Sequence, residues 1–322
     1  MALICYHASH EQFSPSELLQ YAIRAEGAGF DGIHSSDHFH PWSKRQGHSG
    51  YSFSWIAAAM QATTVPFSMV CAPGQRYHPA LVAQAIATLD ELFPGRINVE
   101  LGSGEALNEC ITGEGWPSKT DRNERLRICA QIIRQLLAGE EVTHRGMINV
   151  EKAKLYTLPK SKPLLLCAAI SAETAQWAAS WADGLLTTNE AAQPALLKKI
   201  AAFRNGGGNG KPVYVQFAFS YARDRHSAEQ GAFDQWRSNI LPKEKLAGLR
   251  QVEEFDAAAE AVSLQEVLDA IPVFTSMDHL MEEVNKLKST GVERIVLHNI
   301  CRPHHEFLED FASFNKRKDS LR

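Results

Sequence analysis

The sequence has no Cys-x-x-Cys pair, no long apolar run and no cluster of basic residues, and each absence argues against a class of protein. Its six cysteines lie at wide, irregular spacings, unlike those of a zinc knuckle or a disulfide framework. No apolar stretch approaches the ~20 residues that a membrane span needs. Lys and Arg are scattered over a chain of formal net charge −4. We therefore expect neither nucleic acid nor a membrane as a partner.

The N-terminal segment MALICYHASHEQ has an apolar run too short for a signal peptide, and no positive region precedes it. We expect a cytoplasmic protein whose cysteines are reduced and mostly buried. With 44% hydrophobic and 22% charged residues, the composition is that of an ordinary globular protein. The length of 322 residues would allow two domains, but α/β barrels of this size are often one domain.

Short apolar runs alternate with longer amphipathic stretches along the whole chain, a pattern typical of βα units around a parallel sheet. The predicted strands are Leu3–His7, Gly32–Ser36, Phe67–Cys71, Ile97–Leu101, Pro163–Cys167, Gly184–Thr187, Val213–Phe219 and Arg294–His298. The predicted helices are Ser16–Gly29, Tyr51–Ala62, Pro79–Leu92, Arg122–Leu137, Glu173–Ala182, Pro194–Phe203 and Met277–Ser289. We predict an α/β fold, a (β/α)8 TIM barrel formed by a single domain (residues 1–322), with a helical insertion at about 220–276, after the seventh strand.

Polar residues follow several of the predicted strands, at the end where barrel enzymes place their reacting groups. Glu11 follows the first strand, Asp37, His38 and Trp42 follow the second, Arg76 to Pro79 follow the third, and Glu105 and Asn108 follow the fourth. Carboxylates and an imidazole that meet in a partly apolar pocket shift one another's pKa, as general acid and base catalysis requires. We therefore expect Glu11, Asp37, His38, Trp42 and Glu105 to meet at one rim of the barrel.

Four of these stretches, in the same order, resemble a known family. They are Ser36–Trp42, Arg76–Ala80, Ala83–Leu89 and Gly102–Glu109. They are similar to the coenzyme F420-dependent glucose-6-phosphate dehydrogenase group of the luciferase-like superfamily, whose cofactor is a deazaflavin. The similarity is close as far as Glu190 and weaker after it.

The resemblance implies a flavin or deazaflavin in the barrel mouth, with FMN and coenzyme F420 as the candidates. The implied cofactor contacts are Asp37, Met69, Val70, Ala72, Ser103, Gly104, Asn108, Ala168, Ala169 and Thr188. A non-prolyl cis peptide bond between Met69 and Val70 is implied as well. In the same comparison His38 would take the substrate hydroxyl proton, Glu11 and Trp42 would help to hold the charged states, and Glu105 would manage the proton at the ring.

The chain also departs from that group. A Lys follows the position of Thr188 in the sugar-phosphate enzymes, whereas this chain continues Asn189-Glu190-Ala191. The stretch Phe255–Ala270 is acidic and apolar where those enzymes carry basic phosphate ligands. A phosphate dianion would lack its usual partners, so we expect a small alcohol, carbonyl or related compound in place of glucose 6-phosphate. The shortened form resembles a branch thought to lack the deazaflavin, which makes FMN a candidate, and the relatives suggest a homodimer.

Three other functions remain open at this point. Monooxygenase chemistry occurs in the same superfamily, and the sequence has no decisive oxygen site. A metal-dependent barrel hydrolase could use His38 and His40, which would lie on one side of a strand, although later strands offer no obvious further ligand. A non-catalytic relative that stores or senses flavin would bind the cofactor without using His38.

Overall fold

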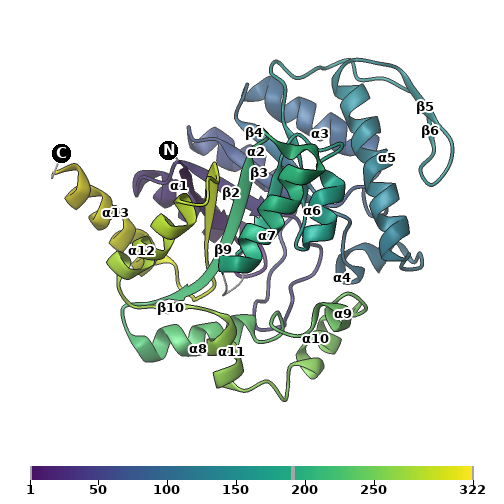
Figure 1. Ribbon diagram of the computed structural model, residues 1–322. Helices are drawn as coiled ribbons and strands as arrows, with labels where there is room; N and C mark the ends of the chain where they lie inside the picture. The colour runs from purple at the N-terminus through teal and green to yellow at the C-terminus, as the bar shows by residue number, and fades with distance from the viewer. Residues whose placement is uncertain (1, 190–192, 321–322) are drawn as a thin grey trace.

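The computed structural model describes residues 2–189 and 193–320, and a closed parallel barrel lies at its centre (Figure 1). Its strands are β1 (Leu3–Ala8), β2 (Gly32–Ser36), β3 (Phe67–Cys71), β4 (Ile97–Leu101), β7 (Leu165–Ala168), β8 (Leu185–Thr188), β9 (Val213–Tyr221) and β11 (Arg294–Asn299). They are paired in the order β9-β11-β1-β2-β3-β4-β7-β8, and β8 pairs again with β9 to close the sheet. The predicted strands and the (β/α)8 barrel are confirmed.

Helices follow the strands and cover the outside of the barrel. They are α1 (Pro15–Gly27), α2 (Ser52–Ala62), α3 (Pro79–Leu92), α5 (Lys119–Leu137), α6 (Ala172–Ala178), α7 (Gln193–Phe203), α12 (Met277–Lys288) and α13 (His305–Asp319). Helix α5 begins before the predicted Arg122, because Ser118 Oγ accepts the Asp121 N–H and satisfies the first turn. Among the described residues, no helix has both the length and the apolar character that crossing a bilayer requires.

The chain between β9 and α12 forms the predicted insertion. It contains α8 (Arg225–Trp236), α9 (Lys243–Leu246), α10 (Val252–Ala258), α11 (Leu264–Ala270) and the short strand β10 (Val273–Phe274). In Figure 1 it lies along the bottom of the molecule, on the side of α4 (Ala106–Glu109), which follows the end of β4. The insertion therefore lies near the carboxyl ends of the strands. An antiparallel hairpin, β5 (Val142–His144) and β6 (Val150–Ala153), was not predicted, because its two strands are too short to show alternation.

The inside of the barrel is unusually polar beneath its mouth. Tyr6 and Ile33 pack outward in the main hydrophobic core, so the alternation of a strand directs their neighbours His7 and His34 inward. The two imidazoles are joined through their Nδ1 atoms at 2.8 Å, and Gln216 joins His298 at 2.9 Å. Burial is the main cause that lowers the pKa of His7, His34 and His298, so these three imidazoles are neutral at pH 7.

Candidate active site

The loops after β1 and β2 bring a carboxylate and an imidazole into direct contact. His38 Nδ1 donates to Glu11 Oε1 at 2.5 Å. Glu11 is 3% exposed and also accepts hydrogen bonds from the hydroxyls of Ser9 at 2.8 Å and Ser36 at 3.2 Å. Burial by itself would raise the pKa of Glu11, but the charge and hydrogen bond of His38 outweigh it and lower that pKa far below its usual range. Glu11 is therefore a fixed anion beneath His38.

The protonation of His38 follows from its carboxylate neighbours. Burial opposes its charge, yet Glu11, followed by Glu105 and Asp37, raises the pKa of His38 from 6.5 to about 9. At pH 7 the side chain is thus an imidazolium held against an anion. It is 19% exposed, and its second nitrogen, Nε2, lies 3.9 Å from Glu105 Oε2. That nitrogen is the one available to a reacting group at the mouth.

Two further predicted residues complete the surroundings of His38. Trp42 meets the imidazole edge-on, with ring centroids 5.3 Å apart. Glu105 precedes α4, and its side chain caps no backbone N–H, so the carboxylate is free to face the site. Although that side chain is 45% exposed, the protein around it still desolvates the carboxylate, and with Glu109 and Glu11 nearby its pKa is raised. The structure thus gathers Glu11, Trp42 and Glu105 around His38, while their catalytic roles stay predictions.

A buried arginine fixes the turn that carries His38. Arg76 Nη2 donates at 2.9 Å to both the carboxylate and the backbone carbonyl of Asp37, and Tyr77 adds a hydrogen bond to the same carboxylate. The backbone N–H of Arg76 donates to Glu109 Oε2 at 3.0 Å, and the side-chain Nε lies 3.5 Å from Glu109 Oε1. Arg76 therefore links the end of β2 to α4. Sequence reasoning placed it among the strand-end residues but missed this role, because its partners are remote in sequence.

Asn108 makes a second link between the same two segments. Its Oδ1 accepts the backbone N–H groups of Phe39 at 2.9 Å and His40 at 3.0 Å, and its Nδ2 donates to Glu105 Oε2 at 3.4 Å. His40 in turn contacts the carbonyl of Leu107 through Nδ1 at 2.9 Å. His38 and His40 thus have different partners. Within residues 2–189 and 193–320, no group of three or more His, Cys, Asp or Glu side chains is arranged to hold a metal ion.

The residues predicted to contact a cofactor lie at the ends of neighbouring strands, and they differ in their solvent exposure. Those with partly exposed surfaces are Val70, Ala72, Ser103, Gly104, Ala168 and Thr188, whereas those that are buried are Asp37, Met69, Asn108 and Ala169. Asp37 has a fully covered side chain that is already paired with Arg76. Glu190 and Ala191, where a Lys is missing, lie outside the described residues.

Several of the partly exposed residues are small, and a lysine lies beside one of them. Ala72, Gly104 and Ala168 carry no bulky side chain, and Gly104 has a φ of +77° at which an added Cβ would lie 2.7 Å from Glu109. Lys119 Nζ donates to Ser103 Oγ at 2.8 Å, and burial lowers the pKa of this lysine. The set suits a flat ring that approaches the backbone, with an anionic group near Lys119.

The predicted cis bond between Met69 and Val70 is wrong. In the described chain the one cis peptide bond is Arg302–Pro303. Val70 instead continues a regular parallel ladder, paired with Ser36 on one side and Glu100 on the other. A non-prolyl cis bond costs about 2.5–4 kcal/mol, and this ladder is formed with the trans bond.

The first prediction concerns the pKa of His38. In protein labelled at histidine, its NMR signals, identified by their loss in His38→Asn, should titrate near pH 9. The Glu11→Gln variant should bring this pKa toward or below 6.5, because the opposing effect of burial remains. Glu124→Gln, at an exposed carboxylate, serves as the control and should change nothing. A His38 pKa that is the same with and without Glu11 would refute the ion pair.

The second prediction compares two arginine pairs. Arg76→Met removes the cation from buried Asp37 and Glu109 and should lower the free energy of unfolding by about 3–5 kcal/mol. Arg127→Met removes an exposed cation paired with Glu124 and should cost about 0–1 kcal/mol. Urea unfolding at pH 7 measures both. Equal losses in the two variants would show that Arg76 does not hold the turn.

With this geometry in view, comparison with known proteins gives a consistent result. Residues 3–294 match the family model described as luciferase-like monooxygenase. The chain is 32% identical over 319 residues to the F420-dependent glucose-6-phosphate dehydrogenase of Mycolicibacterium smegmatis, covering 95% of this chain and 94% of that protein. The enzyme of the same name from Mycobacterium tuberculosis (strain ATCC 25618 / H37Rv) is also 32% identical, over 320 residues, covering 96% of this chain and 95% of that protein.

Solved structures agree with the sequence relatives. An F420-dependent secondary alcohol dehydrogenase, in complex with an F420-acetone adduct, has a TM-score of 0.89 and 31% identity, and the match covers 97% of this chain and 98% of that one. The coenzyme F420-dependent tetrahydromethanopterin reductase of Methanopyrus kandleri, at 17% identity and a TM-score of 0.75, shares the fold. The resemblance predicted from the sequence is confirmed and extends well beyond Glu190. The chain therefore belongs to the luciferase-like monooxygenase family.

Proposed function

We propose that this protein transfers hydride between a flavin-type cofactor and a small, uncharged alcohol or ketone, with coenzyme F420 as the first candidate and FMN as the second. The observation that carries the proposal is the Glu11–His38 ion pair, whose free nitrogen Nε2 faces the mouth. Relatives named for F420, and a similar structure named as a secondary alcohol dehydrogenase with an F420-acetone adduct, support this choice. Six free cysteines agree with action in the reducing cytoplasm.

The residues at the ends of β3, β4 and β7 fit such a cofactor. The backbone around Ala72, Gly104 and Ala168 would contact the ring, and Ser103 with Lys119 would bind an anionic part of the molecule. When bound, the cofactor supplies the hydride acceptor or donor, and the protein supplies position and proton transfer. Buried Asp37 and Asn108 would act through the turn that they hold, and not through direct contact.

Proton transfer then belongs to His38. In alcohol oxidation, the neutral imidazole accepts the hydroxyl proton at Nε2 as hydride leaves the carbinol carbon. Glu11 stabilises the imidazolium that forms and fixes the ring through Nδ1. In ketone reduction, the same imidazolium returns the proton to the oxygen. Trp42 contacts the imidazole edge and limits its rotation, while Glu105 adds negative charge beside Nε2.

The neighbourhood of Trp42 supports an uncharged substrate. Besides His38, the Trp42 ring meets Phe255 of α10, with centroids 5.4 Å apart. Phe255 is 1% exposed, so this end of the site is backed by a packed apolar side chain. A phosphate group against these rings would lose its hydration, and the nearby Arg45 is already paired with Asp256.

The third prediction tests activity. Fluorescence titration should show saturable binding of F420 or FMN, and the loaded protein should interconvert 2-propanol and acetone. His38→Asn should lower kcat by about 10²–10⁴-fold with cofactor affinity unchanged. Oxidation should accelerate as pH rises toward 9, because it needs neutral His38, whereas reduction should slow above that pH. Binding without turnover of any alcohol or ketone would favour a flavin store, and substrate-dependent oxygen uptake would favour a monooxygenase.

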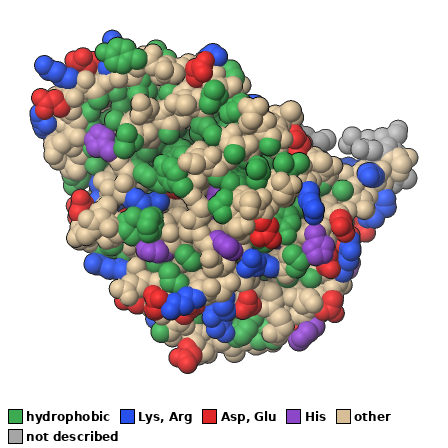
Figure 2. Space-filling view, turned by 180° about the vertical axis from the view of Figure 1, so that it is seen from behind, with side chains coloured by type: hydrophobic (Ala, Val, Ile, Leu, Met, Phe, Trp, Pro, Cys, Tyr) green, Lys and Arg blue, Asp and Glu red, His purple; other side chains and the backbone are tan. Residues whose placement is uncertain are grey.

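We also propose that the protein is a homodimer formed through α2 and α3. Between Tyr51 and Leu89 the only Lys, Arg, Asp or Glu is Arg76, whose side chain is 8% exposed. The exposed residues of α2, and those of α3 as far as Thr88, are uncharged, and they include Ser54, Ala58 and Gln61 on α2 and Leu81, Gln84 and Thr88 on α3. Figure 2 shows hydrophobic side chains gathered on the upper part of the face turned away in Figure 1, with few charges among them. A wide uncharged face is typical of a subunit interface.

The fourth prediction tests this interface. Leu81→Arg places a charge at a side chain that is 61% exposed and should convert the dimer to a monomer in size-exclusion chromatography with light scattering. Tyr156→Arg, at a side chain that is 93% exposed and outside α2 and α3, is the matched control and should remain dimeric. A monomeric parent protein at micromolar concentration would exclude the proposal.

A further inference from the structure

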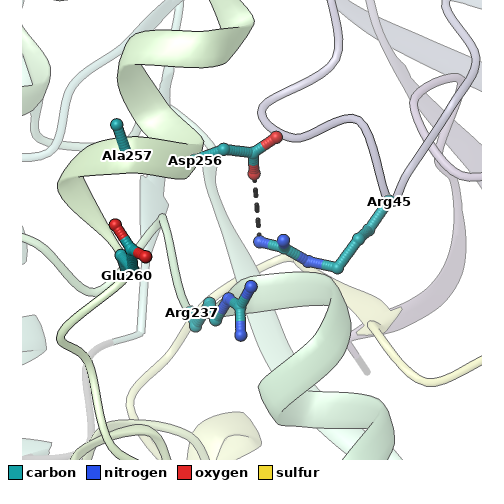
Figure 3. Close-up of a pocket in the computed structure, with 5 residues that line it drawn as sticks. All are labelled: Arg45, Arg237, Asp256, Ala257 and Glu260. Carbon is teal, nitrogen blue, oxygen red and sulfur yellow. Dashed lines mark ion pairs between the residues drawn. The ribbon is translucent and has the colours of Figure 1, made fainter.

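An open pocket lies where the insertion meets the loop after β2. Arg45 from that loop, Arg237 just after α8, and Asp256, Ala257 and Glu260 on and just after α10 line a space of about 370 Å³. Figure 3 shows the guanidinium groups of Arg45 and Arg237 close to one another, with the two carboxylates on the α10 side. The lining contains two cations and two anions, so it is electrically balanced as it stands.

The two arginines differ in how well they are neutralised. Arg45 Nη2 lies 3.0 Å from Asp256 Oδ1. Arg237 packs over the ring of Phe233 at 4.9 Å, and its buried Nε has no hydrogen-bond partner. In the part of the chain that the structure describes, no ion pair within 4.0 Å involves Arg237. The pocket therefore has two guanidinium groups beside one opening, and the guanidinium of Arg237 has no ion-pair partner. Such groups are the donors that a carboxylate or phosphate needs.

Asp256 is the group that opposes such an anion. Besides pairing with Arg45, it accepts the Ser43 hydroxyl at 2.6 Å and the Lys44 N–H at 3.1 Å. Its neighbour Phe255 contacts Trp42, which contacts His38. The pocket is therefore two ring contacts from the reacting nitrogen. A substrate that reaches past Trp42 would bring its far end toward this carboxylate.

We propose that Asp256 is a specificity-determining residue that keeps a two-arginine anion site closed and so restricts the reaction to uncharged substrates. The effect on substrate choice rests on the proposed function, but the anion site itself can be tested by binding alone. Removing the charge of Asp256 leaves two guanidinium groups and one carboxylate, Glu260, in the pocket lining, while Asp234 Oδ1, outside the lining, stays 3.7 Å from Arg45 Nε. The balance of the lining then becomes positive, and an anionic group is attracted.

The test uses the full chain with Asp256→Asn, which keeps the shape and an acceptor oxygen for Ser43. Calorimetric titration with inorganic phosphate should show binding at least about tenfold tighter than in the parent protein. Adding Glu260→Gln should tighten it further, and adding Arg237→Ala should abolish it. Asp269→Asn removes an exposed carboxylate elsewhere in the insertion and should leave phosphate binding as in the parent. Glu260→Gln alone provides a second variant with one carboxylate removed from the lining (an unmasking variant) if Asp256→Asn fails to fold.

The second arm of the experiment measures turnover with loaded protein. Asp256→Asn should raise kcat/KM for the anionic alcohol 3-hydroxybutyrate relative to uncharged 2-butanol, whereas Asp269→Asn should not. Unchanged phosphate affinity in both unmasking variants, or equal gains in Asp269→Asn, would overturn the proposal. If phosphate binds as predicted but neither alcohol is turned over, the proposed function is contradicted. The two-arginine anion site is still supported in that case.

Discussion

The buried pair of Glu11 and His38 is the interaction on which the rest of the site depends. Placing two charges in a protein interior is costly unless other groups replace the lost water. The hydroxyls of Ser9 and Ser36 do this for Glu11, and the partly open mouth does it for His38. The result is an imidazolium that is stable at pH 7 yet close enough to neutrality to exchange its proton.

The surrounding structure fixes this pair from two sides. Beneath it, the inward imidazoles of the barrel are neutral because they are buried, so they add no competing cation. Beside it, Arg76 and Asn108 connect the turn of His38 to the helix that follows Glu105. His38 and Glu105 therefore have a fixed spacing before any ligand arrives, which is the condition that the proposed proton transfer requires.

The sequence predicts the barrel and the meeting of the candidate site residues, for a physical reason. Parallel strands end at one rim, so residues such as Glu11, His38 and Glu105 that each follow a strand must be neighbours. What it does not predict depends on contacts between distant segments. The pairing of Asp256 with Arg45 and the role of Arg76 have no local pattern, since any arginine near a strand end would look the same. The β5–β6 hairpin and the trans bond at Met69 likewise depend on pairing partners that lie elsewhere in the chain.

The most direct test of the central claim is to follow the hydrogen itself. With 2-propanol deuterated at its carbinol carbon and the F420-loaded protein under nitrogen, mass spectrometry of the reduced F420 should show one deuterium per acetone formed, because a deazaflavin receives the hydride at a carbon that does not exchange with water. His38→Asn should slow this transfer without diverting the label. Acetone that forms with the deuterium released to water, or only when oxygen is admitted, would contradict direct hydride transfer at this site.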